Sequence, residues 1–293
     1  EEGACLSYCI GCTRTGMAAV VDAQLDTRPY LQLLSKNNLR LTYVMETHSQ
    51  ADHLSGAQSL SEATGARLFF HESVEANFAV NRVKHGDELA IGNILVRVLH
   101  TPGHTRDSIC MVVTDTTRSS EPWFILTGDT LFVGDVGRPD LHGSAEDLYE
   151  SLYHKLLQLP DMLEVFPAHY AGSVCGKSLS PKPSSTIGFE RRFNPALQFK
   201  TKDEFVKFVQ SDLPVQPPRF EKVRQFNLGF LAEPPIEKTF DKSSLEISVE
   251  ELKQKLDRGE MSFLLDVREP VEYQIAHIKG HLIPLGQLPE RLC

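Results

Sequence analysis

Short apolar runs recur along the first 170 residues, and polar or glycine-containing turns separate them. Runs of this length and spacing predict β-strands. The dipeptide Gly92-Asn93 between two of the runs predicts a hairpin. The predicted strands cover residues 5–10, 18–22, 39–45, 67–70, 88–91, 94–99, 109–114, 123–127 and 164–169.

Helical spacing of apolar positions alternates with these strands, at residues 30–37, 55–64, 145–157 and 201–210. A group of strands followed by helices occurs twice along the chain, which predicts an α/β fold with two sheets packed between helices. Residues 178–185 are rich in Ser, Pro and Lys and predict a loop.

The chain is long enough for two domains. Prolines in 213–219 and a polar stretch at 233–244 place the boundary there. We therefore predict a first domain at 1–232, a linker at 233–246 and a smaller region at 247–293. This region opens with Ser248 and Glu251 spaced as a capping box, followed by a helix to Asp257 and a strand at 262–267.

Composition and charge narrow the function classes. The 293 residues carry a net charge of −9, which argues against a general nucleic-acid surface. No apolar run is long enough to suggest a membrane span, and no signal peptide is visible. The six cysteines give no disulfide framework, which favours a reducing compartment. Cys9 and Cys12 form a single C-x-x-C without a partner pair, so we expect them to be small core residues.

Side chains that bind metals gather where predicted strands end. Residues 47–53, Thr-His-Ser-Gln-Ala-Asp-His, follow the strand at 39–45. Ligands in open α/β folds tend to bind beyond such strand ends, and imidazole with carboxylate suits a divalent first-row metal. The recurring candidates are His48, Asp52, His53, His104, Asp129 and His169. His71, His85 and His142 have no motif around them and are expected at the surface.

The pattern at 48–53 resembles the His-x-His-x-Asp-His signature of the metallo-β-lactamase superfamily, with Gln50 in place of the second histidine. The resemblance covers about residues 1–230 and implies an αββα sandwich. Carried over, it implies a first metal position with His48, His104 and Asp129. Asp52, His53 and His169, with Asp129 shared, would form a second position or lie behind the first one.

Without the second histidine, the first position has two histidines and one carboxylate, the ligand set of mononuclear non-haem iron(II) oxygenases. The chain resembles the persulfide dioxygenases in Glu46-Thr47-His48, in residues 101–105, Thr-Pro-Gly-His-Thr, and in residues 127–132, Thr-Gly-Asp-Thr-Leu-Phe. Residues 137–140, Gly-Arg-Pro-Asp, and 167–169, Pro-Ala-His, also match. The stretch at 172–177 resembles a subgroup fused to a rhodanese domain.

This resemblance implies oxidation of glutathione persulfide, or a related low-molecular-weight persulfide, by O2 to sulfite and thiol, with one Fe(2+) per chain. Candidate substrate contacts are Arg138, Tyr170, Ser173 and Arg191, because guanidinium binds carboxylates and the other two follow His169 closely. Cys175 is a reactive thiol near the pocket or a buried residue. We expect a homo-oligomer, a dimer or tetramer, located in a bacterial cytoplasm or, after removal of a targeting peptide, in the mitochondrial matrix.

Residues 265–285 resemble the first half of a rhodanese domain. No Cys-x-x-x-x-Arg loop follows Pro284, and Cys293 is the last residue. We therefore predict a partial rhodanese-like region without sulfurtransferase activity. Two other hypotheses for the whole chain stay open. One is a dinuclear zinc thioesterase or lactonase resembling glyoxalase II. The other is a non-catalytic relative that binds persulfides or a partner.

Overall fold

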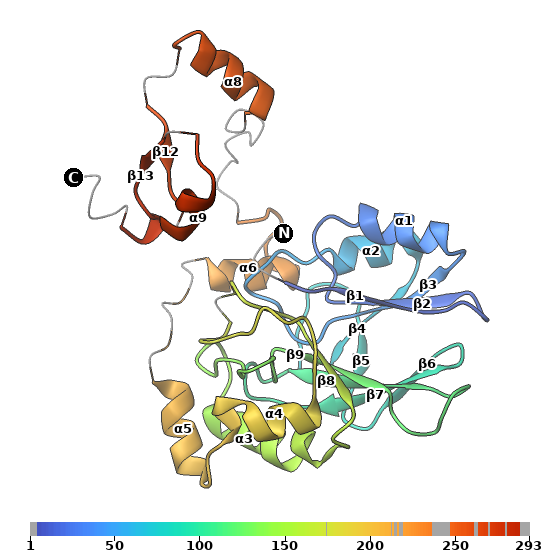
Figure 1. Cartoon of the computed structure of the whole chain (residues 1–293). Helices are drawn as coiled ribbons and strands as arrows, with labels where there is room; N and C mark the ends of the chain where they lie inside the picture. Colours follow the sequence, from blue (N-terminus) through green and yellow to red (C-terminus); the bar gives the residue numbers. More distant parts are fainter. Residues whose placement is uncertain are drawn as a thin grey trace. The chain divides into compact units, whose positions relative to one another are not determined.

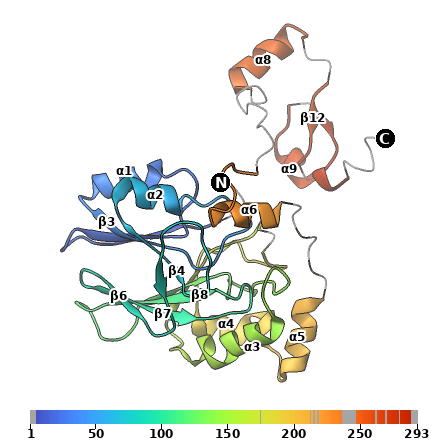
Figure 2. The same cartoon turned by 180° about the vertical axis from the view of Figure 1, so that it is seen from behind.

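The structure is a computed structural model that describes residues 5–287 except 174, 212, 214–215, 217–218, 236–246, 261–262, 269 and 279. Its internal contacts divide the chain into two compact units, Glu1–Pro235 and Ile236–Cys293. Figures 1 and 2 show the elements of each unit from opposite sides.

The first unit contains two sheets. The five-stranded sheet has the order β1 (Tyr8–Cys12), β2 (Met17–Val21), β3 (Arg40–Met45), β4 (Arg67–His71) and β5 (Asn81–Val83). Strand β1 pairs with β2 antiparallel, and the other neighbours are parallel. The parallel strands β2 to β4 therefore end at the same edge of the sheet.

The second sheet contains six strands. Its order is β11 (Ser185–Thr186), β10 (Glu164–Pro167), β9 (Phe124–Gly128), β8 (Ile109–Asp115), β7 (Ile94–His100) and β6 (Glu88–Ile91). Strands β9 and β10 are parallel and the other pairs are antiparallel. The hairpin predicted at Gly92 is present between β6 and β7.

Helices cover the outer face of each sheet (Figure 1). On the first sheet lie α1 (Arg28–Lys36) and α2 (Ala57–Thr64). On the second lie α3 (Ala145–His154), α4 (Ile187–Phe193) and α5 (Lys202–Gln210), with the short 3-10 helices η1 (Leu156–Gln158) and η2 (Pro195–Leu197). Helix α6 (Phe220–Asn227) follows α5.

Strand β2 shows why the layers stack in this way. Ala18 and Val20 pack with the helices of the first sheet, whereas Ala19 and Val21 pack between the two sheets. All four are fully buried, as expected when successive side chains of a strand point to opposite covered faces. The predicted αββα sandwich is therefore confirmed.

Several predicted boundaries differ from the structure. Strand β1 begins at Tyr8 rather than at residue 5, and helix α3 ends at His154, where η1 takes over. The prediction that His71 lies at the surface is wrong. Because β4 continues through His71, the side chain is only 5% exposed, and its ring stacks on His100. His85 and His142 are exposed, as predicted.

Helix α6 was not predicted from the sequence, and neither were α4 and β5. In α6, Phe220 is the only buried residue, and the other apolar side chains, Val223 and Phe226, are only partly buried. Its partly buried side chains include the polar Arg224 and Asn227, which contact the candidate site. The helix is short and directly follows the proline-containing stretch 213–219, which the sequence analysis assigned to the domain boundary.

The second unit contains a parallel pair of two short strands, β12 (Leu265–Asp266) and β13 (His281–Leu282). Helix α8 (Val249–Asp257) precedes the pair, α9 (Pro270–Ile275) lies between its strands, and the 3-10 turn η3 (Leu285–Gln287) follows them. The predicted capping box of Ser248 and Glu251 is present with both hydrogen bonds. Residue 262, the predicted start of β12, and Cys293 lie outside the described residues.

Candidate metal centre

Three predicted ligands come together at the edge where the strands of the two sheets end. His48 follows β3, His104 follows β7 and Asp129 directly follows β9. Their ligand atoms all lie within 4.8 Å of one another, and all three residues are buried. The two imidazole rings meet edge to face, with ring centroids 5.0 Å apart.

Hydrogen bonds orient both imidazoles with one nitrogen toward this centre. The Thr47 hydroxyl donates to Asp22 Oδ2, so its oxygen accepts from His48 Nδ1 at 3.0 Å. His104 Nδ1 donates to the carbonyl oxygen of Arg138 at 2.9 Å, because a carbonyl can only accept. In each ring the lone pair then lies on Nε2, as in metal-binding histidines whose other nitrogen is held by a neighbouring group.

The carboxylate of Asp129 indicates what belongs between these rings. Its Oδ2 is buried and has no hydrogen-bond partner among the described residues, and it lies 3.4 Å from His104 Nε2. An unpaired buried carboxylate oxygen is costly unless a cation satisfies it. Burial lowers the pKa of His48 to about 4, so this imidazole is neutral, as a ligand must be. The three residues therefore fit a divalent metal ion.

A second group of potential ligands lies beside the first and shares Asp129 with it. Each ring nitrogen of His169 is hydrogen-bonded to a carboxylate oxygen. Nδ1 lies 2.8 Å from Asp129 Oδ1, and Nε2 lies 2.7 Å from Asp52 Oδ2. His53 Nδ1 lies 3.2 Å from Asp52 Oδ1. Asp52, His53 and His169 are thus together, as predicted, and linked to the first group.

The charges of this group support one another when no metal is bound. Burial alone would lower the pKa of His169, but the carboxylates of Asp129 and Asp52 hold it well above its usual range. Burial alone would raise the pKa of Asp129, and the imidazolium of His169 holds it below its usual range. A bound cation would supply the positive charge that the protonated His169 provides in its absence.

Gln50 is buried close to the first group but is directed to another partner. Its amide Nε2 donates to Asp22 Oδ1 at 3.1 Å, and its Oε1 has no hydrogen-bond partner among the described residues. The side chain that replaces the second histidine of the superfamily signature is therefore held by Asp22, a carboxylate that also accepts from the backbone and hydroxyl of Thr47.

The loop that carries the ligands is fixed by residues that the sequence did not single out. Asp107, which is buried, accepts from the backbone nitrogen of Ser49 at 2.6 Å and from its hydroxyl at 3.1 Å. Asn227 of α6 donates to the carbonyl oxygens of Gln50 and His53 at 3.0 and 2.8 Å. These backbone contacts hold the loop between the two sheets in one conformation.

Of the predicted substrate contacts and Cys175, Arg138 and Cys175 lie beside the centre, whereas Tyr170 and Ser173 follow His169 in the chain. The carbonyl oxygen of Arg138 accepts a hydrogen bond from His104 Nδ1. The guanidinium of Arg138 makes a bidentate contact with Asp140 at 2.8 Å. Tyr170 and Ser173 lie half-buried in the turn after His169. Cys175 is buried, and its sulfur lies within 4.8 Å of ligand atoms of Asp129 and His169. Burial raises the pKa of this thiol well above its usual range.

Arg191 lies elsewhere. It is in α4, where its guanidinium pairs with Asp161 and donates to the carbonyl oxygen of Leu159. These contacts join α4 to the segment after η1, and they account for the charge of Arg191 without a substrate.

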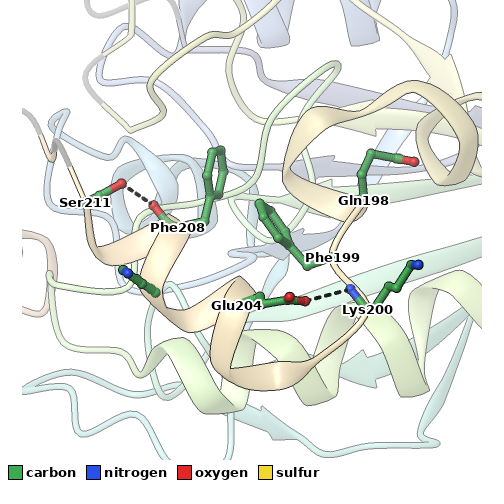
Figure 3. A pocket seen from close by; sticks show the side chains of 7 residues that line it. Gln198, Phe199, Lys200, Glu204, Phe208 and Ser211 are labelled. Carbon is green, nitrogen blue, oxygen red and sulfur yellow. Dashed lines mark hydrogen bonds between the residues drawn. The ribbon is translucent and has the colours of Figure 1, made fainter.

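A larger hollow lies away from the candidate ligands. It is an open hollow of about 630 Å³ between η2 and α5, and Figure 3 shows Phe199 and Phe208 among the residues that line it. A small hollow of about 10 Å³ is lined by Arg138 and Phe208 among others. None of the predicted metal ligands lines either hollow.

Comparison with known proteins agrees with the fold. The model of the metallo-beta-lactamase superfamily matches residues 1–169, and the chain belongs to this superfamily. The model of the rhodanese-like domain matches residues 248–284. Among the described residues, no helix is long and apolar enough to cross a membrane.

Relatives of two activities are similar to this chain. The human mitochondrial persulfide dioxygenase ETHE1 is 30% identical over 206 residues, covering 69% of this chain and 75% of that protein. A hydroxyacylglutathione hydrolase of Polaromonas sp. is 29% identical over 249 residues, covering 75% and 92%. The crystal structure of ETHE1 from Myxococcus xanthus superimposes with a TM-score of 0.68 at 31% identity, covering 77% of this chain and 96% of that one.

Proposed function

We propose that this protein is a non-haem iron dioxygenase that oxidises glutathione persulfide or a related low-molecular-weight persulfide. One Fe(2+) per chain would be held by His48, His104 and Asp129. In the overall reaction RSSH, O2 and water give RSH, sulfite and two protons, so the outer sulfur is oxidised and dioxygen is reduced.

The position of Gln50 carries this proposal. Its amide donates to Asp22, which leaves two imidazoles and one carboxylate around the first position. This is the donor set of iron(II) oxygenases, in which the remaining positions are open to substrate and dioxygen. The bound iron would supply a common site for both reactants, which makes their meeting intramolecular. The likeness to the human and the Myxococcus ETHE1 proteins supports the same activity.

Residues around the centre would orient the ligands and the substrate. The Arg138 carbonyl fixes the tautomer of His104, and His169 holds the distal oxygen of Asp129. Tyr170 and Ser173, in the turn after His169, are the proposed contacts for the persulfide carrier. The Arg138 guanidinium forms an ion pair with Asp140, so a substrate carboxylate would compete with Asp140 for it.

Metal analysis combined with oxygen uptake tests the proposal. The protein is purified anaerobically, its metals are measured by mass spectrometry, and oxygen uptake is followed with glutathione persulfide. We expect about one iron per chain, oxygen consumption and sulfite. His48→Ala should lose iron and activity, whereas His85→Ala, which changes an exposed histidine, should keep both. Stoichiometric zinc in place of iron, with no oxygen uptake after iron reconstitution, would refute the proposal.

A second candidate is a thioester hydrolase, which the intact Asp52, His53 and His169 and the Polaromonas relative favour. In this case the metal positions formed by these residues and the first group would hold zinc, which would supply an activated water for the hydrolysis of a glutathione thioester. Hydrolysis of S-lactoylglutathione by the zinc-loaded protein, without oxygen uptake by the iron-loaded protein, would select the hydrolase.

A further inference from the structure

One face of helix α6 lies on the loop that carries His48. Phe220, Arg224 and Asn227 share this face, because positions i, i+4 and i+7 lie on one side of a helix. Phe220 packs with Ala51 of the loop, and the Asn227 side chain donates to two of the loop's carbonyl oxygens. Arg224 therefore lies between two fixed contacts with the metal-binding loop.

The guanidinium of Arg224 is held at one of its three nitrogens. Its Nε donates to Ser49 Oγ at 3.3 Å, and Ser49 directly follows the candidate ligand His48. Among the described residues, the two terminal nitrogens of Arg224 make no hydrogen bond or ion pair, and the side chain is half-buried. These two nitrogens are therefore available to an anion at the edge of the candidate centre.

Two carboxylates near Arg224 have other partners. Asp107 accepts from the backbone nitrogen and the hydroxyl of Ser49, and within the part of the chain that the structure describes no ion pair joins it to Arg224. Glu221, one turn earlier on α6, lies 3.0 Å from His142 Nε2. The charge of Arg224 is therefore not neutralised by either carboxylate, and a guanidinium in this state binds anionic groups well.

The two arginines predicted from the sequence differ from Arg224 in this respect. The guanidinium of Arg138 pairs with Asp140 at 2.8 Å. Arg191, in α4, pairs with Asp161. Arg224 has only a neutral hydroxyl as its partner among the described residues, so it is a better candidate than either of them for contact with a substrate anion.

The length of a glutathione carrier agrees with this position. Glutathione is a tripeptide, and at roughly 3.3–3.6 Å per residue its carboxylates lie within about 10 Å of its sulfur even when it is extended. Ser49, which holds the guanidinium, is the neighbour of His48 in the chain, with Cα atoms about 3.8 Å apart. A carrier whose sulfur lies at the candidate centre can therefore extend toward Arg224.

We propose that Arg224 binds a carboxylate of the thiol carrier and thereby selects substrates whose carrier bears one. This role rests on the proposed function, because it needs a substrate whose sulfur lies at the metal. The two terminal nitrogens would donate to the two carboxylate oxygens, the paired geometry that arginine and carboxylate favour, while Nε stays on Ser49. Arg224 is then a specificity-determining residue that binds the carrier and takes no part in the oxidation.

Anaerobic calorimetry with the iron-loaded protein tests the proposal. The probes are glutathione, the thiol product, and glutathione diethyl ester, in which neither carboxylate is charged. We expect Arg224→Gln to weaken glutathione binding at least about tenfold and to leave ester binding unchanged, because only the charge-assisted pair is lost. Arg224→Lys should restore part of the affinity, since lysine keeps the charge without the fork. The matched control is Lys222→Gln, which removes an exposed charge from α6 and should bind both probes as the wild type does.

The two probes separate carrier binding from a structural role. A structural role of Arg224 would weaken the binding of both probes or lower the iron content, and either result would refute the proposal. Equal glutathione affinity of the wild type and Arg224→Gln, or no binding to the wild type, would also refute it. With glutathione persulfide, KM should rise by the same factor at unchanged kcat, as for a contact made equally in the ground and transition states. If the wild type takes up no oxygen but binds glutathione through Arg224, the proposed oxidation fails and the role of Arg224 stands.

Discussion

Replacement of Asn227 by alanine should destabilise the first unit and loosen the metal-binding loop. The side chain of Asn227 makes three hydrogen bonds, to the carbonyl oxygens of Gln50 and His53 at 3.0 and 2.8 Å and from the backbone nitrogen of Ser55 at 2.9 Å. Each is worth about 0.5–1.5 kcal/mol, and the three share a partly buried site, so Asn227→Ala should cost about 2–3 kcal/mol. Iron affinity should fall about tenfold, because the loop orients His48.

Urea unfolding followed by the fluorescence of Trp123 measures this cost. The chain has one tryptophan, and it lies next to β9 in the first unit, so the signal excludes the second unit. Asn77→Ala is the matched control, because Asn77 is exposed and its side chain makes one hydrogen bond, to the carbonyl oxygen of Gly229. If Asn227→Ala lowers the free energy of unfolding no more than Asn77→Ala does, the reasoning about α6 is wrong.

Three further predictions concern backbone, metal and cap. Gly103 has a φ of +149°, and a Cβ there would lie 2.4 Å from the Leu148 Cα, so Gly103→Ala should cost well over 2 kcal/mol by urea unfolding. The control is Gly86→Ala, which should cost only about 1 kcal/mol, because Gly86 has a φ of +88° but faces open space. Chelation of the metal should lower the melting temperature, because the buried Asp129 Oδ2 then lacks its partner. Iron at 100 times its Kd should restore about 2.7 kcal/mol of the free energy of unfolding. Equal melting curves with and without metal would contradict this. Ser248→Ala should reduce the helicity of unit 2 by circular dichroism at a cost of about 1 kcal/mol, since it removes the cap of α8; unchanged helicity would speak against the capping role.

The metal ligands could be predicted because each follows an apolar run, and such runs predict strands whose ends meet at one edge. That rule gave six candidates, and the choice of His48, His104 and Asp129 as one group rested on the resemblance to the superfamily signature. Cys5, whose Sγ lies 3.2 Å from His169 Nε2, could not be found in this way, since it precedes the first strand and is brought to His169 only by the fold. Asn227 was missed because α6 carries polar residues on its contact face, and its partners lie more than 170 residues earlier in the chain.

The loop at 47–53 shows how the fold contributes to the site beyond the motif itself. Asp22 accepts from the Thr47 nitrogen at 2.7 Å, Asp107 accepts from the Ser49 nitrogen at 2.6 Å, and Asn227 donates to the Gln50 and His53 carbonyls. These three residues come from the end of β2, from the turn before β8 and from α6. Because each holds backbone rather than a ligand side chain, the ligands are arranged before a metal binds, and less ordering entropy opposes binding. Metal affinity in this protein is therefore coupled to the packing of both sheets and of α6.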